Sequence, residues 1–178
     1  MRTHPGIGIA LAAALILGGC GNALHAPTEA GPVTSPPAPA REIAELLAAP
    51  DSIVIDGATY WAVANINRDF MLGNPDHRAT ADMHLRSADV DSITTLRPKY
   101  VWVIHGTETW GAEVRMIYSA RAWGAPEWGM HAAEVRAVAV GGPEWQVQDS
   151  VQVVTGISDS TGVIRLLRCP DGVVTSSG

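Results

Sequence analysis

Two histidines and two aspartates lie close together in the sequence and have residue types suited to binding a metal ion. Asp76 and His77 precede a segment in which Asp82 and His84 alternate with apolar residues. On an extended strand Asp82 and His84 share one face, and a preceding loop could bring His77 and Asp76 toward them. Zinc needs three or four such ligands converging on one point, and no compact motif such as His-Glu-x-x-His is present. The alternation therefore favours a polar, solvent-facing strand, and a metal site or enzyme built on His77 and His84 is the alternative.

A nucleophilic serine is not indicated by the sequence. Ser158 and Ser160 follow Gly156, but the second glycine of a Gly-x-Ser-x-Gly elbow is absent, and Asp and Ser are ordinary turn residues. His105 lies before Gly106 at the end of a predicted strand, where no catalytic partner is evident. No glycine-rich phosphate loop follows any predicted strand. We therefore expect no catalytic residues, no metal ligands and no cofactor, and a protein that is not an enzyme.

Tryptophan is abundant, with six residues against a single phenylalanine. Trp61 and Trp102 lie in predicted strands, where we expect them to fill the core. Trp110, Trp123 and Trp128 lie in or beside loops that contain Gly and Pro, where an exposed aromatic ring could contact a protein, a peptide or a glycan. The alternative is that these three rings pack back onto the domain.

The N-terminal residues have the pattern of an export signal. An apolar run from Ile7 to Leu17 follows Arg2 and is too short to span a bilayer. The run ends in Leu17-Gly18-Gly19-Cys20, which resembles a bacterial lipobox. This resemblance implies cleavage of residues 1–19 and lipidation of Cys20. The absence of an aspartate at position 21 then favours the outer membrane, facing the periplasm, in a Gram-negative cell.

Charge and cysteine content narrow the remaining function classes. The net charge is −6 and the basic residues are scattered, which argues against binding of nucleic acid. An acidic domain is also repelled by anionic lipids, so we expect membrane attachment through the lipid on Cys20. Cys169 then has no partner within the chain and should be buried, whereas a Cys20–Cys169 disulfide would contradict the lipobox.

Composition divides the chain into four parts. Residues 1–19 are the signal peptide, and residues 20–50 comprise the lipidated cysteine, a disordered Pro/Ala-rich tether and one short helix within residues 41–49. Residues 51–172 carry the strand patterns and form the predicted domain. Residues 173–178 are predicted to be a polar tail.

The domain shows the period-two alternation of β-strands. Asp56-Gly57 predicts a tight hairpin turn between two apolar runs, and residues 158–162 predict a second hairpin loop. Strands are predicted at 53–55, 59–63, 79–86, 100–104, 114–118, 132–140, 151–154 and 163–167. Short strands at this spacing are typical of an all-β, antiparallel β-sandwich.

Two resemblances extend this interpretation. The segment from Trp145 to Leu167, with Asp149 in its turn, resembles the last hairpin of immunoglobulin-like domains of bacterial envelope proteins, although Val147-Gln148 stands where Pro-Gly is common. Arg68-Asp69-Phe70-Met71, Pro75-Asp76 and Val101-Trp102-Val103 resemble elements of a group of uncharacterised bacterial lipoproteins. That group carries no known activity to transfer. We therefore expect a lipid-anchored, non-catalytic binding or structural module of the cell envelope, with protease inhibition by a loop as a further alternative from fold analogy.

Overall fold

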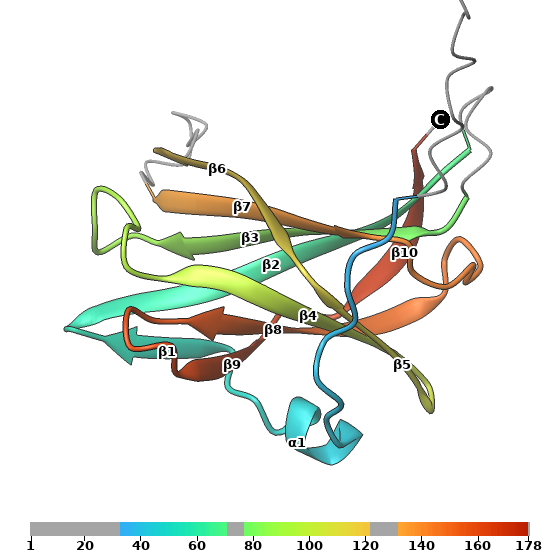
Figure 1. Ribbon diagram of the computed structural model, residues 1–178, viewed down its shortest axis with the longest axis horizontal. Helices are drawn as coiled ribbons and strands as arrows, with labels where there is room; N and C mark the ends of the chain where they lie inside the picture. Colours follow the sequence, from blue (N-terminus) through green and yellow to red (C-terminus); the bar gives the residue numbers. More distant parts are fainter. Residues whose placement is uncertain (1–32, 71–76, 122–131, 178) are drawn as a thin grey trace, which may run out of the picture. The chain divides into compact units, whose positions relative to one another are not determined.

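The computed structural model of the protein describes residues 33–70, 77–121 and 132–177. Within these residues the chain forms ten strands and one short helix, which confirms the all-β class (Figure 1). In chain order the elements are α1 (Ile43–Leu47), β1 (Ser52–Ile55), β2 (Ala58–Asp69), β3 (Ala79–Ser87), β4 (Arg97–His105), β5 (Glu108–Glu113), β6 (Arg115–Arg121), β7 (Ala133–Val140), β8 (Ser150–Ser158), β9 (Ile164–Arg168) and β10 (Gly172–Ser177).

The hairpin predicted at Asp56-Gly57 joins β1 to β2. Both turn residues have positive φ, 52° for Asp56 and 82° for Gly57, as a two-residue turn with the twist of its flanking strands requires. Ile55 pairs with Ala58 directly across this turn. The predicted loop at 158–162 likewise joins β8 to β9, and Asp159 accepts hydrogen bonds from the backbone N–H groups of Thr161 and Val163.

The strands form one sheet that curls until its two ends meet. Their order is β5-β4-β8-β10-β2-β3-β7-β6, with β1 beside β2 and β9 beside β8. The strands at the two ends of this order, β5 and β6, are consecutive in the chain and separated by Val114 alone. The Val114 N–H donates to the Lys99 carbonyl over 3.0 Å, so the chain pairs with β4 before this residue and with β7 after it. The result is a nearly closed barrel.

The sheet is mixed, because β10 runs parallel to β2. Val174 pairs with Ile66, while the beginning of β10 pairs antiparallel with β8. The prediction of a purely antiparallel sheet is therefore wrong at this strand, and the prediction of a polar tail at 173–178 is wrong for the residues that β10 contains. Val173, Val174 and Thr175 are β-branched and favour a strand, and Val174 is fully buried.

The interior of the barrel is filled by alternate residues of its strands. Along β3, Ala81, Met83 and Leu85 point into the core, while Asp82 and His84 lie on the opposite face, as the alternation predicted. The same core contains Cys169, which is 1% exposed.

A second, smaller core lies on the outer face of β4. Residues 101–104 of this strand are buried on both faces, because α1 covers the outer one. Trp102 and Ile104 pack there against Leu46 of α1 and Val154 of β8. The helix predicted within 41–49 is confirmed at Ile43–Leu47, and Pro50 follows its end.

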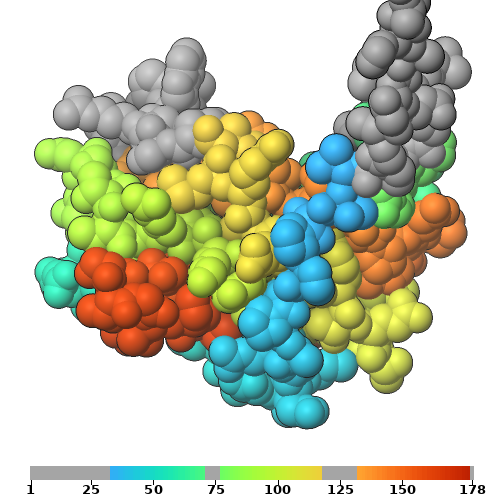
Figure 2. Space-filling view, in the orientation of Figure 1, coloured from blue at the N-terminus to red at the C-terminus, as the bar shows by residue number. Residues whose placement is uncertain are grey.

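Residues 33–40, called the strap below, lie along the edge of β5. Figure 2 shows the strap in blue on the surface of the molecule, continuing into α1. Pro37 pairs with Ala112 in an antiparallel bridge, and the Ala38 N–H donates to the Gly111 carbonyl over 3.1 Å. This part of the predicted tether is therefore docked on the sheet. Its composition indicates an extended chain correctly, but composition alone does not reveal the strand edge that it covers.

Candidate functional site

The strongest candidate site lies at a seam where the curled sheet is incompletely paired. β1 is paired with β2 and β9 with β8, and the two strands turn their other edges toward each other. The Arg168 N–H donates to the Pro50 carbonyl over 2.8 Å at one end of this seam. Beyond Arg168 the chain leaves β9 and crosses to β10 through Cys169, Pro170 and Asp171. Proline lacks an N–H and ends the pairing there.

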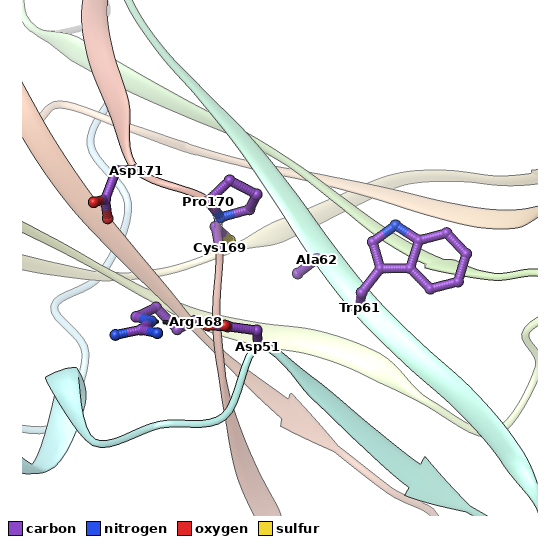
Figure 3. A pocket seen from close by; sticks show the side chains of 7 residues that line it. All are labelled: Asp51, Trp61, Ala62, Arg168, Cys169, Pro170 and Asp171. Atoms are coloured by element: carbon purple, nitrogen blue, oxygen red, sulfur yellow. Dashed lines mark hydrogen bonds and ion pairs between the residues drawn. The ribbon is translucent and has the colours of Figure 1, made fainter.

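A pocket of about 370 Å³ opens at this crossing (Figure 3). This volume is within the usual range for small-molecule sites, roughly 300–1,000 Å³. Its lining comes from the segment before β1, from β2, and from the end of β9 with the connection that follows it: Asp51, Trp61, Ala62, Arg168, Cys169, Pro170 and Asp171.

Asp51 and Arg168 form the charged pair of this pocket. Arg168 Nε donates to Asp51 Oδ1 over 2.8 Å, and Arg168 Nη1 also reaches the Leu47 carbonyl at 3.4 Å. The hydrogen bond from Arg168 lowers the pKa of Asp51, and the same bond raises the pKa of Arg168. Both groups therefore stay charged across the physiological range, although the Asp51 side chain is 73% exposed. The pair offers a fixed dipole to a polar ligand and no titrating acid or base.

Cys169 lies in the wall of the pocket, but its thiol is suited to packing. Its backbone N–H donates to the Val153 carbonyl over 2.8 Å, and burial raises its pKa to about 12. The thiolate is the nucleophilic form of cysteine, so a thiol held protonated in this way is inert. The predicted burial of Cys169 is confirmed.

Asp171 connects this pocket to a second hollow. That hollow has a volume of about 550 Å³ and lies between β4, β8 and β10, with Gly106, Gln152 and Val173 among its lining residues. Asp171 is exposed and belongs to both hollows. Together they offer a carboxylate, a paired guanidinium and the half-buried indole of Trp61. The carboxylates of such a set can accept hydrogen bonds from hydroxyl or amino groups.

The two histidines of the predicted alternative site lie apart. His77 stands before β3, where its Nδ1 lies 2.8 Å from the Asp69 carbonyl oxygen and its ring stacks on Phe70. His84 lies five residues into β3, which corresponds to about 17 Å of strand. In the described parts of the chain, no group of three or more His, Cys, Asp or Glu side chains is placed to hold a metal ion. Asp76 lies outside the described residues.

His84 belongs instead to a cross-strand charge network on β3 and β7. Its Nδ1 lies 2.9 Å from Glu134 Oε1, and its Nε2 lies 3.5 Å from Asp82 Oδ1. Arg86 Nε donates to Glu134 over 2.8 Å, and Arg136 Nε donates to Asp82 over 2.7 Å. Burial raises the pKa of Glu134, but the hydrogen bonds from His84 and Arg86 and their charges together lower it below its ordinary value. The network satisfies its own charges, so it stabilises the pairing of β3 with β7.

The burial of the tryptophans agrees with the predictions at some positions and differs from them at others. Trp102 is 1% exposed, as predicted for the core, whereas Trp61 is half-buried and lines the pocket. Trp110, predicted to contact a partner, is also half-buried, and its ring packs so closely on Gly142 that a Cβ there would lie 2.8 Å from it. Trp123 and Trp128 lie outside the described residues.

Cys20 also lies outside the described residues, so its lipidation stays a prediction. In residues 33–70, 77–121 and 132–177, no helix has the length and apolar character needed to cross a membrane.

Sequence reasoning missed the pocket, and the cause is sequence separation. Asp51 and Arg168 are 117 positions apart and become neighbours through the sheet topology. The nearest available signal was Cys169-Pro170-Asp171, where a proline ends a strand and a carboxylate follows at once.

Comparison of the chain with protein-family models, with curated proteins and with solved structures found no match.

Proposed function

We propose that the protein is a lipid-anchored component of the bacterial cell envelope whose domain is a non-catalytic binding or structural module. The observation that carries the anchoring is Leu17-Gly18-Gly19-Cys20 at the end of a short apolar run. In a Gram-negative cell the domain would face the periplasm from the outer membrane. An immunoglobulin-like arrangement of its strands belongs to the same proposal, supported by the resemblance of the Trp145–Leu167 hairpin.

The pocket at the seam supports the binding role. Its charged pair, Asp51 and Arg168, is already mutually satisfied, and its thiol is held protonated, so these three groups suit recognition better than chemistry. Asp171 is exposed beside them, and Trp61 and Ala62 of β2 also line the pocket. A hydroxyl-rich or amine-bearing ligand, such as a glycan or a peptide of an envelope protein, fits these groups best. Trp123 and Trp128 remain proposed partner contacts on other loops.

The anchoring is tested by metabolic labelling with radioactive palmitate. Wild-type protein should incorporate the label and give an intact mass that corresponds to a chain starting at residue 20 plus lipid. The C20S variant should incorporate no label. An unlabelled wild-type chain that still begins at Met1 contradicts the anchoring.

The binding role is tested by capture of envelope components with purified wild-type protein and with the variants W61A and D171N. Thr161→Ala serves as the matched control, because Thr161 is exposed in the distant β8–β9 loop. We expect species that are captured by wild type and the control and are lost with both pocket variants. Identical capture by all four proteins contradicts the assignment of the pocket.

A further inference from the structure

The strap is bound with a periodicity that indicates a specific groove. Ser35, Ala38 and Arg41 are half-buried, whereas the residues between them are exposed. A spacing of three is the repeat of a polyproline II helix, which prolines at 36, 37 and 39 favour. One side of an extended three-fold helix therefore faces the domain, and the other sides face solvent.

Hydrogen bonds join the half-buried side of the strap to the domain. The Ser35 N–H donates to the Val140 carbonyl over 3.0 Å, and the Val140 N–H donates to Ser35 Oγ over 3.1 Å. The Glu113 N–H donates to the Pro36 carbonyl over 2.7 Å, which adds to the Ala38–Gly111 bond on the same edge of β5. These bonds satisfy backbone groups that a free strand edge would expose.

Aromatic and glycine residues complete the groove. Trp102 Nε1 donates to the Pro39 carbonyl over 3.1 Å, and the Arg41 guanidinium lies 5.9 Å from the centre of the Trp102 ring. Gly111 leaves room for Ala38, since a Cβ at Gly111 would lie 3.3 Å from the Ala38 Cβ and 2.9 Å from the Trp102 ring. Proline-rich segments dock in aromatic-lined grooves, and extended peptides add to exposed strand edges. This groove combines the Trp102 ring with the edge of β5.

The strap can leave this groove without opening the interior of the barrel. It lies on the outside of the molecule (Figure 2), and most of its residues are exposed. The strap packs on the small core of Trp102 and Leu46 through Ala38 alone, and the other residues of that core belong to α1 and the strands β4, β8 and β9 or lie beside them. Because every contact is made with residues 33–41, an identical segment from another molecule can make the same set.

We propose that the groove along β5 is an exchangeable binding site for an extended proline-rich segment, and that its second occupant is the strap of another copy of this chain. In a single molecule the attached strap competes at high effective concentration and fills the groove. Two molecules held close together can trade straps and form a strand-swapped pair. The proposal does not depend on the lipid or on the pocket at the seam.

The test uses full-length acceptor chains and a fluorescent peptide of residues 32–41. In the first acceptor, A38P removes the N–H that donates to Gly111 and weakens the attached strap. In the second, residues 34–39 are replaced by a Gly/Ser segment of equal length, which removes the strap contacts altogether. Fluorescence anisotropy measures peptide binding, and circular dichroism with tryptophan emission reports whether each acceptor is folded.

We expect saturable binding to the acceptors that is at least about tenfold tighter than binding to wild type, whose own strap competes. A peptide carrying A38P should bind much more weakly, and a scrambled peptide should not bind. Mixed full-length copies should also form dimers whose yield rises with concentration. Folded acceptors that ignore the peptide overturn the proposal. Failure of both acceptors to fold overturns it equally, because the strap would then be an integral part of the fold.

Discussion

Two edges of the curled sheet differ: one is covered by the strap and the other is left open. The edge of β5 is covered by the strap, whose hydrogen bonds reach the backbone of residues 111 and 113 and the indole of Trp102. The facing edges of β1 and β9 meet at the bond from Arg168 to Pro50, and a pocket opens beside it. Covering an edge prevents unwanted strand pairing, whereas leaving a seam provides access for a ligand. One side of this small domain therefore stabilises the fold, and the other side is open to a ligand.

The largest expected difference between the two sides is the cost of removing their tryptophans. W102A deletes a fully buried ring from the core under α1 and should lower the free energy of unfolding by about 3–5 kcal/mol. W61A removes a half-buried ring from the seam and should cost roughly 1–2 kcal/mol. Urea unfolding of both variants measures the difference. Equal losses would show that the seam is as tightly packed as the covered edge.

Alkaline titration examines how firmly the seam holds Cys169. The pKa of its thiol is raised from an ordinary 9.0 to about 12, so the unfolded chain ionises first as pH rises. The stabilisation is therefore complete below about pH 9 and is lost as pH increases toward 12, by about 1 kcal/mol at pH 10. In a C20S background, C169A should remove this part of the decline in the free energy of unfolding. Rapid thiol labelling of the folded protein at pH 8 would instead reveal an open seam.

Acid titration tests the Glu134 carboxylate, which is better buried than the Asp51 carboxylate at the pocket. The pKa of Glu134 lies below its ordinary value of 4.5, so its stabilising effect is present above that value and is lost as pH falls through the lowered pKa. E134Q should unfold with a weaker acid dependence than wild type in urea titrations at pH 7 and at pH 3. An unchanged acid dependence would assign the acid sensitivity of the fold to other carboxylates.

The smallest effect is expected from the charged pair at the pocket. D51N should change the free energy of unfolding little, because the Asp51 carboxylate is largely exposed and solvent screens its attraction to Arg168. A double-mutant cycle with R168M measures the coupling, and a parallel cycle of Glu134 with Arg86 supplies the reference. A coupling at the seam larger than the reference would give the Asp51–Arg168 pair a structural role.

Local patterns predicted the strands that carry clear alternation. Ala81, Met83 and Leu85 identify the inner face of β3, and Asp56-Gly57 identifies the first hairpin. β5 was not predicted, because Gly111 interrupts the residues that favour a strand. Its pairing with β4 is visible only in the folded structure. The parallel pairing of β10 and the docking of the strap also depend on contacts with distant segments. Such contacts leave no periodic signal in the segments that make them.

At the candidate site, too, local patterns were predictable from the sequence and contacts between distant segments were not. The alternation around His84 correctly indicated a polar strand face, and the network with Glu134 explains why its charges are satisfied there. The pocket requires the end of β9 and the first half of β2 to meet the segment before β1, and that meeting is a property of the topology.

The antiparallel course of the strap against β5 determines the order in which its hydrogen bonds would be loaded by a pull on the N-terminal side of the domain. A force applied at residue 33 would reach the Ser35–Val140 bonds first, then the bond to Pro36, and then the bond from Ala38. The hydrogen bonds of the strap would therefore carry such a load before the strands of the barrel do.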